Sequence, residues 1–312
     1  MTSAAHDHYT LAPPRTEEVS DGVFAYIQPD GSWCINNTGF LVGRDGVVSV
    51  DASSTERRTR AYLDAIASVT TAPVRTLINT HSHLDHTNGN CFFGPLTIVA
   101  HEECRTDMLN TPTMEPGRGH FAGVEWGNVE KAPPTLTFRD SVTVWVDDLE
   151  CEVRYVGTPA HTTNDVIVWL ADRSVLFAGD LVFNGGTPFN VAGSIAGSLT
   201  VLEDIRSLNP EVIVPGHGDV CDVSVIDGLV AYLNFVTETA KASKAAGLTP
   251  LQAALEADLG EFADLLDSER IVGNLHRAYA ELDGVERGAP IGMVAIQEMV
   301  QYNGGQPLRC LA

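Results

Sequence analysis

Positions 80–86 read THSHLDH and hold four residues of metal-binding type within six positions. The segment follows an apolar, β-rich run, so these side chains are expected on a loop at the end of a strand. Two imidazoles separated by one residue, His81 and His83, can converge on one metal ion in such a loop. Asp85 and His86 can turn toward a second ion nearby. An isolated histidine is usually a surface or core residue, but ligand types this closely spaced predict a metal site.

Three further residues of the same kind follow short hydrophobic strands later in the chain: His161, Asp180 and His217. Because strand ends in one sheet share an edge, residues placed there can meet in space although they are far apart in sequence. Glycines beside Asp180 and His217 permit the tight turns that bring the backbone close to a metal ion. We therefore expect all seven residues to form one site.

The order of apolar patterns predicts a mixed α/β core. Helical spacing of apolar residues favours helices at 55–68 and 102–109. Runs with β-strand character occur at 24–27, 39–42, 46–51, 74–79, 96–100, 142–146, 152–156, 166–170, 175–178 and 212–214. Between them, residues 110–134 are rich in Gly and Pro and predict a long loop, which is a candidate substrate lid.

From about residue 226 to residue 300 apolar residues recur at helical spacing, so a helical extension is expected to follow the β-rich part. The predicted organisation is a flexible arm at 1–15, a catalytic domain at 16–222 and an extension at 223–312 packed on it. His6 and His8 lie in the arm, where no helix or strand is expected to hold them on a metal ion.

Charge and cysteine usage exclude several classes of function. With 41 Asp and Glu against 19 Lys and Arg, the net charge of −22 disfavours nucleic acid and anionic membranes as partners. The six cysteines form no C-x-x-C pair, so neither a thiolate zinc site nor a disulfide framework is indicated. The start lacks the layout of a secretory signal, and no apolar run is long enough to span a bilayer. We expect a cytoplasmic protein and leave a homo-oligomer open.

On these residues the chain resembles the metallo-β-lactamase superfamily over roughly positions 20–220. The resemblance implies an αββα sandwich of two β-sheets with helices on both outer faces and metal ions at one end. It also implies a first metal on His81, His83 and His161, a second on Asp85, His86 and His217, and Asp180 bridging them. Two divalent ions are expected, zinc first, with manganese or iron as alternatives. Asp51 resembles a buried position that supports the ligands, or else it is a simple turn residue.

Further segments resemble the second-ring cyclases of aromatic polyketide biosynthesis, the actinorhodin-type cyclase/thioesterase group. The segments that carry this resemblance are GSWCINN at 31–37, VEWG at 124–127, GDLVF at 179–183 with TPF at 187–189, NLHRA at 274–278 and YNGGQ at 302–306. The family implies a small-molecule substrate, a partly cyclised poly-β-ketone held as a thioester on an acyl carrier protein. It implies two reactions, an aldol condensation with dehydration that closes the second ring, and hydrolysis of the thioester.

Roles for individual residues follow from that resemblance. Asp85 is the expected catalytic proton acceptor, although a role as ligand alone is equally consistent. The side chains expected to line the substrate pocket, where aromatic rings suit a flat intermediate, are Trp33, Asn37, Trp126, Phe183, Phe189 and His276. Core packing is the alternative for each aromatic ring, and His101 and His120 are expected to be structural.

Other functions within the superfamily stay open. A general thioester or ester hydrolase needs the same metal centre without ring closure, and a mononuclear iron oxygenase acting on persulfides shares the ligands of the first metal. True β-lactamases are usually secreted and commonly carry Cys or no acid where Asp180 stands, so they fit less well. The acidic charge disfavours RNA-processing members. A non-enzymatic binding protein of this fold is expected to have lost ligands, and none is lost.

Overall fold

The computed structural model describes residues 11–111 and 120–312. Most of the predicted arm therefore lies outside the described residues, together with His6 and His8, and a strand that the sequence reading had not included begins at Arg15. Within the described part, no helix is long and apolar enough to cross a membrane.

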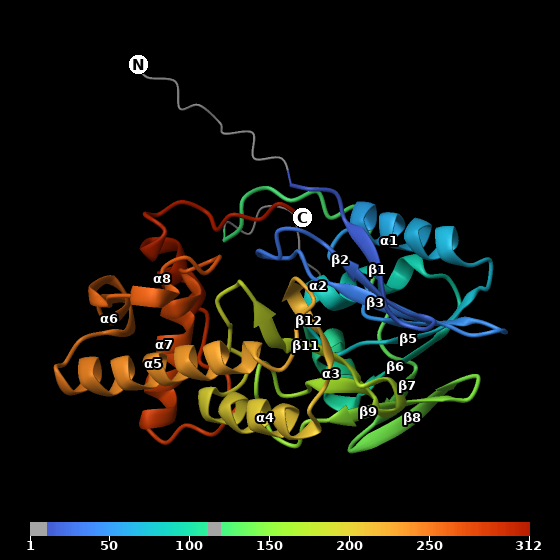
Figure 1. The fold of residues 1–312 in the computed structure, drawn as a ribbon. Coiled ribbons are helices and arrows are strands. Elements are labelled where there is room, and N and C mark those ends of the chain that lie inside the picture. Colours follow the sequence, from blue (N-terminus) through green and yellow to red (C-terminus); the bar gives the residue numbers. More distant parts are fainter. Residues whose placement is uncertain (1–10, 112–119) are drawn as a thin grey trace.

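Two β-sheets form the centre of the fold (Figure 1). The first has seven strands in the order β1-β2-β3-β4-β5-β6-β7, antiparallel from β1 to β4 and parallel from β4 to β7. These strands are β1 (Arg15–Ser20), β2 (Val23–Ile27), β3 (Thr38–Val42), β4 (Val47–Val50), β5 (Val74–Ile78), β6 (Thr97–His101) and β7 (Leu136–Phe138).

The second sheet has five strands in the order β12-β11-β10-β9-β8, all antiparallel except for the parallel pair β11 and β12. They are β8 (Ser141–Val146), β9 (Leu149–Tyr155), β10 (Val166–Leu170), β11 (Val175–Asn184) and β12 (Val212–Gly218). Apolar side chains of both sheets form one buried cluster, for example Leu41 and Val50 with Val168 and Phe177. The two sheets therefore pack face to face and exclude water between them.

Helices cover both outer faces of this sandwich. They are α1 (Glu56–Val69), α2 (Leu84–Thr87), α3 (Glu102–Asn110), α4 (Ile195–Leu208), α5 (Val225–Ala245), α6 (Pro250–Glu256), α7 (Arg270–Leu282) and α8 (Val294–Tyr302). On the first sheet, Tyr62 and Ile66 of α1 pack against Tyr26 and Phe40. On the second sheet, residues of α4 and α5 pack against β11. The αββα sandwich expected from the sequence is confirmed.

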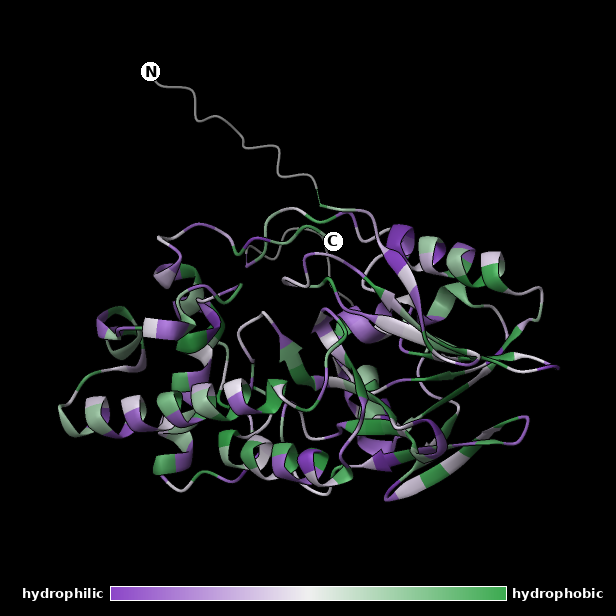
Figure 2. Ribbon diagram, in the orientation of Figure 1, coloured by the Kyte–Doolittle hydropathy of each residue, from purple (hydrophilic) through white to green (hydrophobic). Residues whose placement is uncertain are grey.

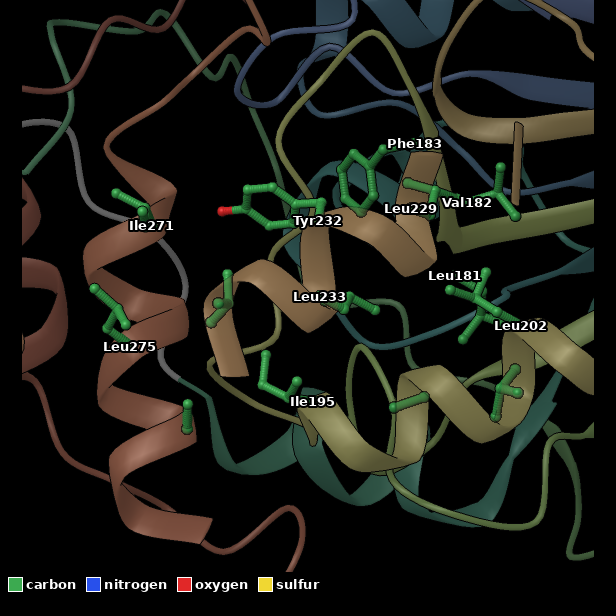
Figure 3. Packing of buried hydrophobic residues seen from close by; sticks show 14 of the residues in the cluster. Leu181, Val182, Phe183, Ile195, Leu202, Leu229, Tyr232, Leu233, Ile271 and Leu275 are labelled. Atoms are coloured by element: carbon green, nitrogen blue, oxygen red, sulfur yellow. The ribbon is translucent and has the colours of Figure 1, made fainter. Parts of the chain in front are cut away.

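The C-terminal helices complete the larger of the apolar clusters (Figure 3). Ile271 and Leu275 of α7 belong to the same buried cluster as Tyr232 of α5 and Val182 of β11. The buried residues of α5 and α7 recur at helical spacing, as expected for amphipathic helices on a sheet. Figure 2 shows apolar and polar residues alternating along the ribbons of these helices. The predicted helical extension is therefore present and packed, while the domain boundary at 222/223 stays a prediction.

Two strands extend further than their apolar runs indicate. The sequence places Asp180 and His217 just beyond strands that end at 178 and 214, but β11 continues to Asn184 and β12 to Gly218. The two strands stay paired past an irregular register between Phe177 and Phe183. An apolar run marks only the part of a strand that is buried among hydrophobic residues, so it ends where the polar site begins. The apolar patterns of the sequence also do not predict β7 or α4.

The predicted loop at 110–134 agrees with the structure where it is described. Asn110 ends α3, and residues 120–134 form no helix or strand. An isolated parallel bridge joins Phe121 to Leu308 near the C-terminus. The role of this loop as a substrate lid stays a prediction.

Candidate metal centre

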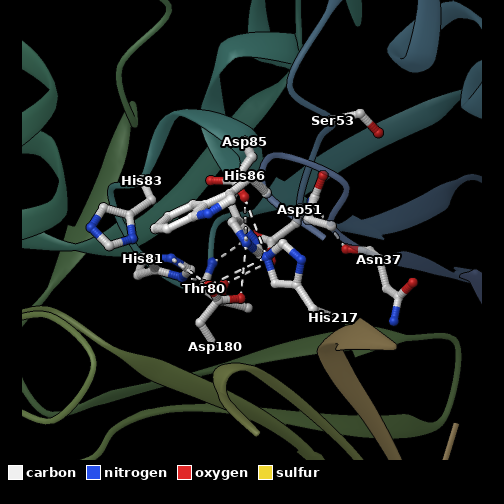
Figure 4. Close-up of polar contacts among 12 residues, drawn as sticks. Asn37, Asp51, Ser53, Thr80, His81, His83, Asp85, His86, Asp180 and His217 are labelled. Atoms are coloured by element: carbon white, nitrogen blue, oxygen red, sulfur yellow. Dashed lines mark hydrogen bonds and ion pairs between the residues drawn. The ribbon is translucent and has the colours of Figure 1, made fainter. Parts of the chain in front are cut away.

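All seven predicted ligands converge at one end of the sandwich (Figure 4). They form two groups, and within each group the possible ligand atoms lie within 4.8 Å of one another. The first group is His81, His83, His161 and Asp180, and the second is Asp85, His86 and His217.

Asp180 lies between the two groups. Its Oδ2 atom is 3.2 Å from Nε2 of His161 in the first group and 3.4 Å from Nε2 of His217 in the second. Its Oδ1 atom is 3.0 Å from Nε2 of His86. One carboxylate can therefore reach both groups, which is the geometry that a bridging ligand needs.

Five separate segments supply these side chains. His81 and His83 lie in the loop after β5, and Asp85 and His86 lie on the short helix α2. The other three come from the second sheet: His161 from the loop between β9 and β10, Asp180 from β11 and His217 from β12. The site therefore forms only when both sheets pack together, although each ligand can be recognised locally in the sequence.

Buried atoms without partners show that the group fits a cation. Among the described residues, Nε2 of His81 is buried and makes no hydrogen bond, and Nε2 of His86 and Oδ1 of Asp180 are buried and face each other at 3.0 Å in a geometry that gives no hydrogen bond. Leaving such atoms unpaired costs about 1–3 kcal/mol each, so a native protein normally satisfies them. Imidazole and carboxylate ligands in this number suit Zn²⁺ and related divalent ions. The residues present therefore fit the metal ions that the sequence implies.

Hydrogen bonds on the other ring nitrogens orient three of the imidazoles. Nδ1 of His161 lies 2.5 Å from the carbonyl oxygen of Phe189, and Nδ1 of His217 lies 3.0 Å from that of Gly31. A carbonyl can only accept, so Nδ1 donates in both cases and Nε2 is left to bind a metal ion. For His86 the partner of Nδ1 is a carboxylate, Asp51 Oδ2, at 2.8 Å.

Asp51 holds the start of the ligand loop as well. It follows β4 with a left-handed backbone (φ 60°) and is 3% exposed. Its Oδ1 accepts from the backbone N–H of Thr80 at 2.7 Å, and its Oδ2 accepts from the Thr80 hydroxyl at 2.7 Å. Asp51 therefore supports the ligands rather than closing a simple turn.

Charge and burial divide the histidines into two kinds. Burial lowers the pKa of His81 and His83, and it lowers the pKa of His161 to about 3, so these three are neutral near pH 7. Burial also opposes the charged form of His86 and His217, but the neighbouring carboxylates outweigh it. The pKa of His86 is raised, and that of His217 is raised to about 9. Without metal, the second group therefore carries protons that a metal ion would displace.

The carboxylates are held ionised. Burial opposes the charge on Asp85 and Asp180, but the imidazoles of His86 and His217 outweigh it and keep the pKa of both groups below the usual range. Asp180 is almost fully buried, whereas the side chain of Asp85 is 15% exposed. Asp85 is therefore the carboxylate that a substrate can approach.

A cavity of about 150 Å³ opens above the two groups. Four of the predicted pocket residues line it: Trp33, Trp126, Phe183 and Phe189. The rest of the lining consists of Cys34, His83, Leu84, Asp85, Phe121, His161, Asp180, His217 and Arg270. The walls are thus mainly aromatic, and the polar groups are concentrated at the metal end.

Arg270, at the start of α7, fixes two of the aromatic walls. Its guanidinium carbon lies 4.0 Å from the ring centroid of Trp33 and 5.3 Å from that of Phe183. Asp267 pairs with its Nη2 at 2.9 Å, and Trp33 donates to Oε1 of Glu269 at 2.7 Å. The C-terminal helices therefore help to shape the pocket, in addition to covering the sheet.

The described lining includes neither Asn37 nor His276. Asn37 donates to the carbonyl oxygens of Pro215 and Gly218 and thereby holds the turn around His217. His276 faces α8, where it lies 2.7 Å from Glu298. His101, expected to be structural, lies 3.0 Å from the carbonyl oxygen of Arg139.

Four lining residues were missing from the sequence reading: Cys34, Leu84, Phe121 and Arg270. The first two are neighbours of residues already singled out, so the motifs themselves contained the signal. An arginine at a helix start normally indicates solvent-exposed surface, and the sequence shows no sign that Arg270 is buried. Only the tertiary packing places it in the pocket.

Comparison with known proteins decides the family. The model of the metallo-β-lactamase superfamily matches residues 31–217, which include every proposed ligand. The chain belongs to the metallo-β-lactamase superfamily. Members are typically metal-dependent hydrolases, and the His and Asp cluster of this member could bind metal.

Relatives within the superfamily differ in function. The chain is 26% identical over 221 residues to a beta-lactamase-like protein 2 homolog of Caenorhabditis elegans, covering 70% of this chain and 68% of the relative. It is 28% identical over 209 residues to the 2,4-dinitroanisole O-demethylase subunit alpha of Nocardioides sp. (strain JS1661), covering 65% and 55%. It is 28% identical over 139 residues to the hydroxyacylglutathione hydrolase of Rhodospirillum rubrum, covering 44% and 45%.

Among solved structures, a metallo-beta-lactamase from Pontibacter korlensis aligns with a TM-score of 0.58 at 21% identity, over 71% of this chain and 99% of that one. At this identity the likeness shows the fold alone. The match spans only about half the length of the O-demethylase subunit and of the hydroxyacylglutathione hydrolase. The closer resemblance to polyketide cyclases remains a prediction.

Proposed function

We propose that this protein is a metal-dependent polyketide cyclase/thioesterase. It closes the second ring of an aromatic polyketide by aldol condensation with dehydration, and it hydrolyses the thioester that joins the product to an acyl carrier protein. The observation that carries the proposal is the position of an aromatic-walled cavity directly above two groups of metal ligands.

The two groups divide the metal ligands as the superfamily resemblance implies. His81, His83 and His161 would hold one ion, Asp85, His86 and His217 the other, and Asp180 both. Two divalent ions bound there would supply Lewis acidity for a carbonyl or enolate oxygen and would lower the pKa of water to about 7. Zinc suits these ligands best, and manganese or iron remains an alternative.

Asp85 is the proposed proton acceptor. It is ionised, lines the cavity and lies 3.3 Å from Nε2 of His217 and 3.9 Å from Nε2 of His86. In thioester hydrolysis it can hold the attacking water and take its proton. In ring closure it can take the proton from the carbon between two carbonyl groups, so that this carbon attacks a ketone. One carboxylate in one place therefore serves both reactions.

The aromatic walls favour a flat, apolar acyl group over a small or strongly charged one. The rings of Trp33 and Phe189 lie edge to face with their centroids 5.0 Å apart, and Phe121 adds a third ring 5.3 Å from Trp33. Such rings contribute stacking contacts to a planar ligand, and they exclude water from the reacting carbonyl. A partly cyclised poly-β-ketone has both the planar part and the reactive carbonyl groups.

An acyl carrier protein is the proposed partner that delivers this substrate. A net charge of −22 provides no general attraction for an acidic partner, so docking has to rest on local contacts. The pair is therefore expected to bind weakly and transiently. The affinity of the pair, measured at low and at high salt, tests this point. If long-range electrostatic attraction drove docking, the affinity would fall strongly as salt rises.

A general thioester or ester hydrolase is the second candidate. The similarity to the hydroxyacylglutathione hydrolase of Rhodospirillum rubrum favours it. The two candidates differ in the ring-closing step alone, since both need the same metal groups and Asp85.

Incubation with a carrier-bound, singly cyclised poly-β-ketone separates them. The proposal predicts a released product that has lost one further water and gained one aromatic ring, detected by mass and absorbance. Release of the unchanged acid, with no second ring, would leave the general hydrolase as the function.

A further inference from the structure

Two ligand-bearing loops share one hydrogen-bond acceptor outside the metal groups. Ser82, which stands between the first two imidazoles, donates its hydroxyl to Oδ2 of Asp107 at 3.3 Å. Asn164, three residues after His161, donates Nδ2 to the same oxygen at 2.8 Å and to the Ser82 hydroxyl at 3.3 Å. Asp107 lies on α3 and is not one of the grouped ligands.

The two loops come from different sheets, so their separation is not set by backbone pairing alone. The first follows β5 of the seven-stranded sheet, and the second joins β9 to β10 of the five-stranded sheet. Asn164 is fully buried at their junction. A carboxylate that accepts from both loops fixes the distance between them, and charge-assisted hydrogen bonds are the stronger kind.

The loop of His161 is itself ordered by its own hydrogen bonds. Asp165 accepts from the backbone N–H of Thr162 at 2.8 Å and from its hydroxyl at 2.6 Å. The Thr162 hydroxyl also accepts from the backbone N–H of Asn164 at 3.1 Å. Because the loop is ordered, a displacement of Asn164 also displaces His161, which would not follow in a flexible loop.

We propose that Asp107 is a positioning residue for the first metal position alone: it holds the His81–His83 pair and His161 at the spacing that one ion requires. The inference rests on the metal roles in the proposed function. It adds that the first position has a support of its own, so that it can be weakened without weakening the second.

The second position has supports that do not include Asp107, although one of them, Asp51, also holds the start of the His81 loop through Thr80. Asp51 holds His86 by its ring nitrogen, and the backbone N–H of Ala52 donates to the carbonyl oxygen of His86 at 3.0 Å. His217 is held by the carbonyl oxygen of Gly31. The hydrogen bonds of Asp107 described above reach none of these residues.

Zinc binding in variants that keep a single position tests the assignment. His217→Ala removes a ligand of the second group, so the first group remains as the stronger site. His161→Ala removes a ligand of the first group, so the second group remains as the stronger site. In each background we would measure the zinc dissociation constant, by competition with a chelating indicator, with and without Asp107→Ala. Asp107→Asn is the conservative variant, because its side-chain oxygen still accepts from Ser82 and Asn164. Thr106→Ala is the matched control, because among the described residues the Thr106 hydroxyl donates only within α3, to the carbonyl oxygen of Glu102.

The expected result is a change in one background only. With the first position alone, Asp107→Ala raises the zinc Kd by about 10-fold or more, the usual range for groups that support metal ligands. Asp107→Asn restores most of the affinity. With the second position alone, neither variant changes the Kd beyond the Thr106→Ala control. Circular dichroism of the metal-free variants checks that each is folded. If Asp107→Ala does not fold, the zinc Kd of Asp107→Asn in the two backgrounds still tests the inference.

Equal weakening in both backgrounds would overturn the inference, because Asp107 would then act on the fold in general. Unchanged affinity in both would overturn it as well. A wild-type protein that binds no zinc, manganese or iron would instead remove the proposed function, and these two failures are distinguished by the wild-type titration.

Discussion

A Cβ atom added at Gly216 would lie 1.9 Å from Oδ1 of Asp180. Gly216 precedes His217 in β12, and Asp180 comes from the neighbouring strand β11. The Asp180 carboxylate, which is proposed to bridge the two metal ions, thus occupies the space of the missing side chain. Gly216 is therefore required because the Asp180 carboxylate leaves no room for a side chain, whereas the backbone of Gly216 continues β12 rather than forming a turn.

Gly216→Ala is therefore expected to abolish binding of two metal ions while every ligand is retained. The added methyl group displaces Asp180, and overpacking of this kind typically costs about 1–3 kcal/mol of stability. Metal content after dialysis and a thermal melt measure the two effects. Gly228→Ala on α5 is the control, because apart from its chain neighbours and the backbone of its own helix no described atom lies within 4 Å of the added methyl group. Two retained ions in Gly216→Ala would contradict the bridging role.

The walls of the pocket predict a substrate-dependent effect of Trp33→Leu. The change keeps an apolar side chain but removes the ring that contacts Phe121, Phe189 and Arg270. We expect KM for an aromatic thioester to rise about 5- to 10-fold, equivalent to about 1–1.5 kcal/mol of stacking. The KM for an acetyl thioester should stay within about twofold, since a small acyl group stacks on no ring.

Trp145→Leu is the control for that experiment. Trp145 is 60% exposed on β8 and does not line the pocket, so its loss should change neither KM. An equal rise in KM for both substrates in Trp33→Leu would contradict the pocket assignment and indicate general damage to the site.

The metal-free protein is expected to lose stability as pH rises from about 6.5 to about 9. The folded pKa of His217 is raised to about 9 from 6.5, because Asp180 and Asp85 outweigh burial. A raised histidine pKa stabilises the fold fully below the unfolded value, and this contribution disappears as pH passes the folded value. The loss is on the order of 3 kcal/mol for a shift of this size.

Denaturant unfolding at pH 6.5 and at pH 9, with and without zinc, measures this dependence. Zinc replaces the proton on His217, so the loaded protein should be nearly insensitive over the same range. Calorimetric titration with zinc near pH 7.5, in two buffers of different ionisation enthalpy, should also show proton release. Equal pH sensitivity with and without zinc would argue against His217 as a ligand.

The residues of the two groups could be predicted from the sequence because each stands in a local pattern of chemistry-bearing residues. His81 to His86 form one dense motif, and His161, Asp180 and His217 each stand next to a small residue or glycine. The alternation of β-rich runs and helical spacing predicts a mixed α/β core, and the resemblance of the ligand motif to the superfamily implies the sandwich. These features depend on short stretches of chain, so they are visible without tertiary structure.

The features that the sequence did not reveal depend on packing between distant segments. Arg270 is an ordinary helix residue until α7 packs against the loop that carries Trp33. His276 lies one turn and a half further along the same helix, in a segment resembling the cyclases, yet it faces α8. The same holds for Asn37, whose amide supports the backbone near His217. Family-like motifs identify important positions but not what each side chain contacts.

Zinc reconstitution of the chelator-treated protein is the most direct test of the central claim. The rate of aromatic thioester cleavage is measured as zinc is added in sub-stoichiometric steps to the wild type and to Asp85→Ala. We predict no cleavage without metal, a rise that ends at two zinc ions per chain in the wild type, and little recovery in Asp85→Ala. Full cleavage by the metal-free protein, or maximal cleavage with a single iron ion, would contradict the two-metal hydrolytic centre.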